Sequence, residues 1–247
     1  ALNASLTAVQ TQSTNLNNIY NSLENDINAG SYGTAATYND AQTPINSALT
    51  AANTASTAAS TATTTANNNL TSASNRITID NAVSVANSTL ASATPTSSAV
   101  DNTAKAGADL LTSAQATTNG YLTSGTSLAS LMNNLSTAVN SLQAANTDAN
   151  TAYNEVTTLS DAIKTADTAN NASGMSDLLT SLATAAGKLK DVSGVAATLS
   201  GQAATLADQV GVATSVASAT STLNNLSAAS TAVSTDYQNA LNNYNAL

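Results

Sequence analysis

Four residue types are missing from this 247-residue sequence: cysteine, histidine, phenylalanine and tryptophan. Without cysteine there is neither a disulfide framework nor a thiolate ligand for zinc. Without cysteine or histidine, the usual nucleophile–base pairs of hydrolases cannot form. The sequence therefore predicts a protein that is not an enzyme, with no catalytic residues, no metal site and no cofactor.

Charge is also sparse, since 5 Lys and Arg stand against 14 Asp and Glu and give a net charge of −9. Such a chain does not attract phosphate backbones or anionic lipid surfaces, so we expect no nucleic-acid partner. No apolar run approaches the ~18 residues of a membrane-spanning helix, and we expect no membrane insertion. No signal peptide is recognisable, and a start at Ala1 is what a processed product or an excised fragment would show.

Ala, Ser, Thr and Asn make up more than half of the residues that are present. Leu, Ile and Val together account for less than a fifth, below the ~20% level that often accompanies disorder. The net charge is nevertheless mild for a disordered chain of this length. Composition alone thus leaves two alternatives, a disordered linker and an ordered structure with a thin core.

The spacing of apolar residues separates these alternatives. They recur at alternating steps of three and four residues, a pattern typical of coiled-coil seams. The most regular seam is Leu128, Leu131, Leu135, Ala138, Leu142, Ala145, Ala149, Ala152, Val156, Leu159, Ile163 and Ala166. A second comprises Met175, Leu178, Leu182, Ala185, Leu189, Val192, Ala196, Leu199, Ala203, Leu206, Val210 and Ala213. After a phase slip near Gly211 the pattern resumes as Val216, Ala219, Leu223, Leu226, Ser230, Val233, Tyr237, Ala240, Tyr244 and Leu247. A disordered linker would not hold this phase, so we predict an all-α protein.

Three short segments interrupt the seams: Gly30–Gly33, Ser92–Thr96 with its Pro95, and Asn170–Gly174. They delimit predicted helices over about 2–29, 34–93, 98–171 and 175–247. Short turns place successive helices antiparallel. We predict a single elongated module over residues 1–247, an antiparallel bundle of three long helices plus a shorter N-terminal helix, with Ala-rich seams.

The main alternative is a shorter bundle with extra breaks at Pro44 and at Gly120–Gly125. Each glycine costs ~1 kcal/mol relative to Ala inside a helix, and proline costs more. Both sites lie within otherwise periodic stretches, and the sequence alone leaves this choice open.

The few charged and aromatic residues suggest structural roles. Asp161–Lys164 and Asp101–Lys105 have the spacing of ion pairs on a helix surface. Most tyrosines fall on the seams and are predicted to be core residues with a surface hydroxyl, namely Tyr20, Tyr38, Tyr121, Tyr237 and Tyr244. Tyr32 lies in a predicted turn and is the one candidate for stacking against a sugar.

The run from Thr50 to Leu70, TAANTASTAASTATTTANNNL, is typical of the composition of the whole chain. This texture resembles the helical, coiled-coil-like Ala/Ser/Thr/Asn-rich regions of large cell-wall-anchored surface proteins and fibrillar adhesins of lactic acid bacteria. The resemblance implies an extracellular, cell-surface location and a role as a stalk or spacer that projects or forms part of a binding fibre. A sorting motif of the LPxTG type is absent, so any anchor would lie outside this sequence.

Two other functions are compatible with the sequence. Ala-rich helices with Thr every eleven residues can bind ice, and Thr43, Thr54 and Thr65 have this spacing, as do Thr50 and Thr61. Alternatively, the chain is itself an adhesin that binds a host glycan or protein through an exposed helical face, or it self-associates into fibres. The sequence singles out no binding residues, and the partner is unknown from it.

Overall fold

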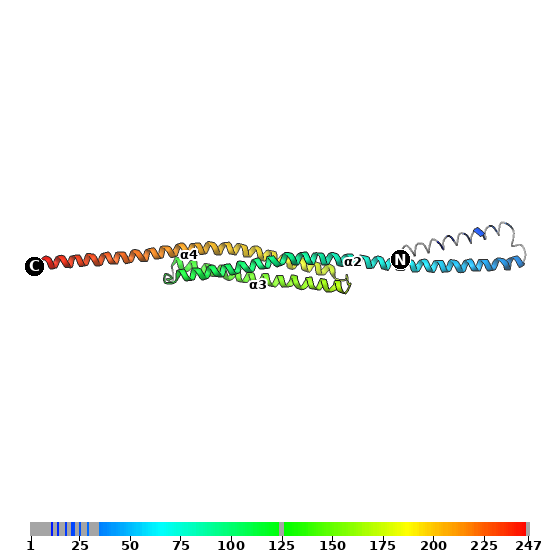
Figure 1. The fold of residues 1–247 in the computed structure, drawn as a ribbon, viewed down its shortest axis with the longest axis horizontal. Helices are drawn as coiled ribbons and strands as arrows, with labels where there is room; N and C mark the ends of the chain where they lie inside the picture. The colour runs from blue at the N-terminus through cyan, green and yellow to red at the C-terminus, as the bar shows by residue number, and fades with distance from the viewer. Residues whose placement is uncertain are drawn as a thin grey trace. The chain divides into compact units, whose positions relative to one another are not determined.

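The computed structural model describes residues 35–123 and 126–245, together with positions 11, 14, 18, 21, 22, 25 and 29. Three helices, α2, α3 and α4, span nearly all of the two long ranges, which contain no strand, and the all-α prediction is confirmed (Figure 1). The chain divides into two compact units, residues 1–78 and 79–247. The predicted helix over 2–29 and its turn at Gly30–Gly33 lie almost entirely outside the described residues.

Helix α2 (Ala35–Thr118) is 84 residues long and passes through two predicted stops. The prediction of a helix end at 93 and a restart at 98 is wrong, as is the alternative break at Pro44. Pro95 has no amide hydrogen, so the carbonyl of Ala91, four residues earlier, has no helical donor. Both residues lie on the exposed side of the helix. On the opposite side Ala93 is buried at 4% exposure and Ser97 at 7%. The burial of residues before and after Pro95 in the sequence therefore keeps α2 helical, although a proline inside a helix costs ~3 kcal/mol of stability.

The real break lies where the alternative placed it, around Gly120. Gly120 has a φ of +94°, and the Tyr121 amide donates to the Thr118 carbonyl at 3.0 Å. A glycine adopts this left-handed conformation without steric cost, which ends α2. The predicted helix over 98–171 is thus the end of α2 plus α3 (Ser127–Thr168), and the Thr126 hydroxyl caps α3 by accepting from the Ala129 amide.

The turn at 171–174 is confirmed. After α3, the Asn171 amide donates to the Ala166 carbonyl at 2.9 Å, which caps the last turn. Gly174, with a φ of +75°, leads directly into α4 (Met175–Asn245). Asp177 lies in the first turn of α4, where a negative charge interacts favourably with the helix dipole.

Within residues 79–247, the second half of α2, α3 and the first half of α4 form a three-helix bundle (Figure 1). Polar contacts between α2 and α3 include Thr94 with Tyr153 at 3.4 Å, Ser97 with Asn150 at 3.4 Å, and Asn146 with Asp101 at 3.0 Å. Numbers rise along one helix as they fall along the other, so α2 and α3 are antiparallel. Lys188 and Glu155 pair across α3 and α4, which are antiparallel as well.

The core of this bundle confirms the predicted seams. Nine of the twelve predicted seam residues of α3 are buried, as are seven of those of α4: Leu128, Leu135, Ala138, Leu142, Ala145, Ala149, Ala152, Val156 and Ile163, then Met175, Leu182, Ala185, Leu189, Ala196, Ala203 and Val210. Met132, Val139 and Ser160 of α3 are buried in addition. Because α3 packs against two helices rather than one, it buries a stripe wider than a two-helix seam.

At Gly107 the backbone of α2 lies close to side chains of α3. A Cβ atom at this position would lie 2.8 Å from Leu142 Cδ1 and 3.8 Å from Val139 Cγ2. Gly187 of α4, by contrast, has nothing within 4 Å of an added Cβ. The absence of a side chain at Gly107 therefore makes room for Leu142.

We predict opposite effects of alanine at these two glycines. Gly187→Ala should raise the free energy of unfolding by about 0.5–1 kcal/mol, because alanine is the better helix former. Gly107→Ala should lower it by about 1 kcal/mol, because displacing Leu142 outweighs the same helical gain. Urea denaturation followed by circular dichroism would measure both, and equal stabilisation by the two variants would contradict the close approach.

Beyond Ser218 the predicted seam of α4 is not a core. Every described side chain from 219 to 243 is exposed. The predicted core residue Tyr237 is 63% exposed, Leu223 66% and Val233 69%. The reason lies in helix lengths, since the Tyr121 hydroxyl reaches Ser218 where α2 has already ended. Residues 219–245, here called the α4 overhang, extend past the turn between α2 and α3 (Figure 1).

Candidate functional surfaces

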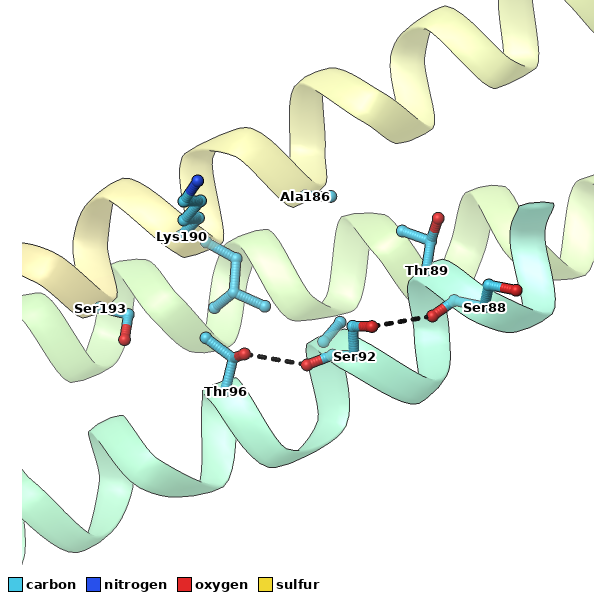
Figure 2. A pocket seen from close by; sticks show the side chains of 9 residues that line it. Ser88, Thr89, Ser92, Thr96, Ala186, Lys190 and Ser193 are labelled. Carbon is cyan, nitrogen blue, oxygen red and sulfur yellow. Dashed lines mark hydrogen bonds between the residues drawn. The ribbon is translucent and has the colours of Figure 1, made fainter.

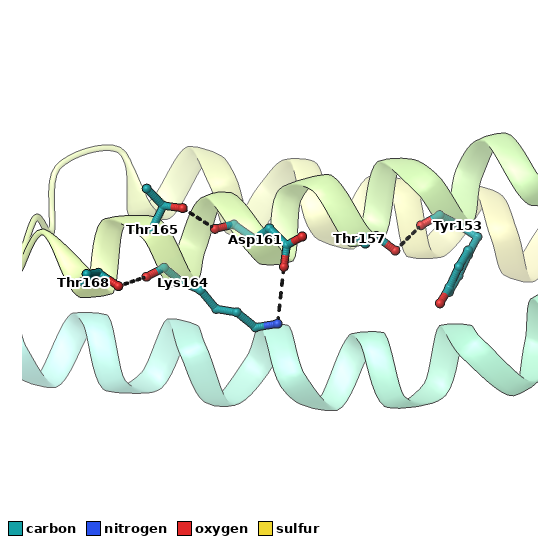
Figure 3. Close-up of polar contacts among 6 residues, drawn as sticks. All are labelled: Tyr153, Thr157, Asp161, Lys164, Thr165 and Thr168. Atoms are coloured by element: carbon teal, nitrogen blue, oxygen red, sulfur yellow. Dashed lines mark hydrogen bonds and ion pairs between the residues drawn. The ribbon is translucent and has the colours of Figure 1, made fainter.

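The hydroxyl groups of the helices are largely engaged by their own backbone. On α3, Thr157, Thr165 and Thr168 donate to the carbonyls four residues earlier at 3.1, 2.8 and 3.0 Å (Figure 3). The same bond recurs in α2 and α4, for example from Thr54 to Thr50 and from Thr205 to Gly201, both at 2.9 Å. These contacts orient each hydroxyl along the helix and use its proton. The threonines therefore present methyl groups and acceptor lone pairs to the surface.

A groove of about 530 Å³ runs between α2 and α4 of the bundle. Figure 2 shows that its α2 wall is formed by small hydroxyl side chains, while Lys190 is the charged residue among those lining it. The hydroxyl of Ser92 donates to the Ser88 carbonyl at 3.1 Å and that of Thr96 to the Ser92 carbonyl at 2.9 Å. Apart from Lys190, the residues that line this groove are aliphatic or carry hydroxyl groups.

A second groove of about 740 Å³ lies between α3 and α4. Its charges are Glu155 and Lys188, which pair with each other at 3.0 Å between Oε2 and Nζ. Both side chains are about half exposed, so solvent screens the pair and its contribution to stability is small. The pair bridges two helices, and Glu155 is the one carboxylate among the residues that line this groove.

The other charged residues are scattered along the helix surfaces. The predicted Asp161–Lys164 pair is present, with 3.4 Å between Oδ1 and Nζ (Figure 3). Asp101 and Lys105 do not pair; Asp101 instead accepts a hydrogen bond from Asn146 of α3. In the described part of the chain, no three acidic residues lie close enough together to hold a metal ion.

No family model, curated protein or solved structure matches this chain. In the described ranges no helix is long and apolar enough to cross a membrane.

The most distinctive surface is the apolar stripe of the α4 overhang. Its largest members are more than 60% exposed except for Leu241 at 39%, and they are Leu223, Leu226, Val233, Tyr237 and Leu241. Most of these residues were predicted to lie on one helical seam, and that seam was expected to be covered by a neighbouring helix. The spacing of apolar residues does not predict which helices lie side by side, and so it could not show that this part of the seam is exposed.

The threonine rows considered for ice binding lie on α2. Thr50, Thr54, Thr61 and Thr65 are exposed, and each hydroxyl donates to the carbonyl four residues earlier. Thr43 and Tyr32 have side chains outside the described residues, so the first row and the sugar-stacking hypothesis remain predictions. Nothing in these contacts distinguishes the rows from the other threonines of the helix.

Proposed function

We propose that this chain is a structural spacer segment of an extracellular surface protein or adhesin. The observation that supports it best is the great length of the helices, together with the scattering of charged side chains over the described residues. Helix α4 has 71 residues, which at 1.5 Å per residue amounts to about 105 Å. A helix of this length, held along its first half by two neighbours, separates its ends by a distance that no loop of equal mass maintains.

The surface chemistry is consistent with this role. Few of the residues are charged, and the hydroxyl protons of the threonines are used within the helices. A spacer needs solubility and stiffness rather than a recognition pocket. The proposed location at the cell wall rests on the compositional resemblance to surface proteins of lactic acid bacteria.

A display experiment tests the spacer function. A small binding domain is placed beyond residue 247, and the fusion is anchored to a bacterial wall with or without residues 79–247. We expect the displayed domain to capture a large soluble ligand less well when the bundle is removed, because the wall then obstructs access. An unrelated helical bundle of similar length should restore capture, and a flexible Gly/Ser linker of the same residue number should restore it less.

Direct recognition gives different results. The purified 247-residue chain, applied to immobilised glycans and host extracellular proteins, should bind none of them, and it should leave ice recrystallisation unchanged. Saturable binding to a glycan or protein, or inhibition of ice growth, would replace the spacer function with one of the two alternatives.

A further inference from the structure

The exposed stripe of the α4 overhang coincides with a sequence repeat. Without any gap, residues 225–247 align with residues 1–23, and 11 of the 23 positions are identical. The identical residues are Leu226, Ala228, Thr231, Ala232, Val233, Thr235, Asn239, Asn242, Tyr244, Asn245 and Leu247, which match Leu2, Ala4, Thr7, Ala8, Val9, Thr11, Asn15, Asn18, Tyr20, Asn21 and Leu23. Abundant Ala, Thr and Asn match easily, but tyrosine occurs only seven times in the chain.

The alignment also preserves the helical phase. The offset of 224 residues (225 − 1) is a whole number of heptads (32 × 7), so a seam position in one segment is a seam position in the other. Leu2, Val9 and Tyr20 correspond to Leu226, Val233 and Tyr244, all of them on the predicted seams. Two segments that share residues and phase have the same face available for packing.

The two segments differ in the part of the chain that is available to pack beside them. Residues 1–23 are followed in the chain by residues 35–78 of α2, within the unit 1–78. The overhang has no corresponding partner in the described ranges, because α2 ends at Thr118 and the stripe beyond Ser218 is exposed. The phase slip near Gly211, seven residues before that point, marks the change from one packing environment to another.

We propose that the α4 overhang is the first helix of a second copy of this repeat, joined in tandem, and that its apolar stripe packs against residues 35–78 of that copy. In this arrangement α4 is shared: its first half closes one three-helix bundle, and its overhang begins the next repeat. The proposal deepens the spacer function, on which its biological meaning rests, because a shared continuous helix joins repeats without a flexible linker.

The two faces differ in the size of their side chains. The overhang presents Leu, Val and Tyr. On α2, Ala59, Ala62 and Ala66 are half-buried among exposed neighbours. Large side chains on one helix opposite alanines on the other allow close approach without voids. Two stripes of large residues, or two of alanine, would pack less well.

Hydrogen exchange on an extended chain tests this pairing. The full 247-residue chain is lengthened after Leu247 by residues 24–78 of a second copy, which restores the 224-residue period and leaves residues 219–245 unique in the product. Amides of 219–245 should exchange at least about tenfold more slowly than in the unextended chain, because the overhang gains a packed face. Amides of 128–163 should not change.

Matched controls separate pairing from added length. An extension with the same residues in shuffled order should give no protection. In the properly extended chain, Val233→Asp on the stripe should remove the gain, whereas Thr235→Asp on the opposite face should keep it. Both positions are exposed in the unextended chain, so both variants should leave its exchange unchanged.

Three results would overturn the proposal. They are unchanged exchange of 219–245 in the extended chain, equal protection by the shuffled extension, and protection of 219–245 in the unextended chain that rises with protein concentration. The last would mean that a separate molecule covers the stripe. None of them bears on the display experiment, so the pairing and the spacer function can fail independently.

Discussion

Leu142→Ala is expected to lower the free energy of unfolding of the bundle by about 2–5 kcal/mol. Leu142 is fully buried on α3, at 0% exposure, and its Cδ1 lies beside the bare backbone of Gly107. Much of the core around it is alanine, which supplies little apolar area per residue. The few large residues therefore contribute a disproportionate share of the stability. Urea denaturation followed by circular dichroism at 222 nm would measure the loss.

Leu223→Ala is the matched control for this prediction. Leu223 is the same residue type on the same kind of helix but is 66% exposed, so its truncation should change stability by less than about 0.5 kcal/mol. The double variant Leu142→Ala with Gly107→Ala provides a second check, because the added methyl enters the space that Leu142 leaves. Its loss should be smaller than the sum of the single losses, and strict additivity would count against their contact.

Ser160→Ala should raise the free energy of unfolding by about 1–3 kcal/mol. Ser160 lies on the buried stripe of α3 at 0% exposure, and its Oγ has no hydrogen-bond partner. A buried hydroxyl without a partner loses its hydration and receives nothing in return, and alanine is also the better helix former. The gain should appear as a higher urea midpoint with an unchanged dependence on denaturant concentration.

Ser141 provides the comparison on the same helix. It is half-buried, and its hydroxyl donates to the Thr137 carbonyl at 3.0 Å. Ser141→Ala removes a satisfied bond and should move stability by no more than about 0.5 kcal/mol. A loss of stability in Ser160→Ala would show that its hydroxyl is hydrogen-bonded in solution.

The seams and the turn at 171–174 could be predicted from the sequence, whereas the predicted helix end at 93 was wrong. Around Pro95 the prediction gave the proline more weight than the seam. Yet stepping back from Val100 by three and four residues reaches Ser97, Ala93 and Leu90, all of which the structure buries at least partly. Packing along that continuous seam outweighs the missing amide. Around Gly120 the helix does end, because the chain turns there through a left-handed φ of +94° that glycine adopts without steric cost.

The apolar stripe of the α4 overhang was likewise predicted only in part from the sequence. The spacing of Leu223, Leu226 and Val233 predicted an apolar stripe correctly, but whether a stripe is core or surface depends on which helices run beside it. That is set by where α2 ends and α3 begins, through contacts distant in sequence such as Tyr121 with Ser218. By itself, the sequence determined the helical class, the phase of the seams and the scarcity of reactive groups, because these depend on residue type and local spacing. Only the tertiary structure decided which half of α4 is buried, because burial requires a neighbour.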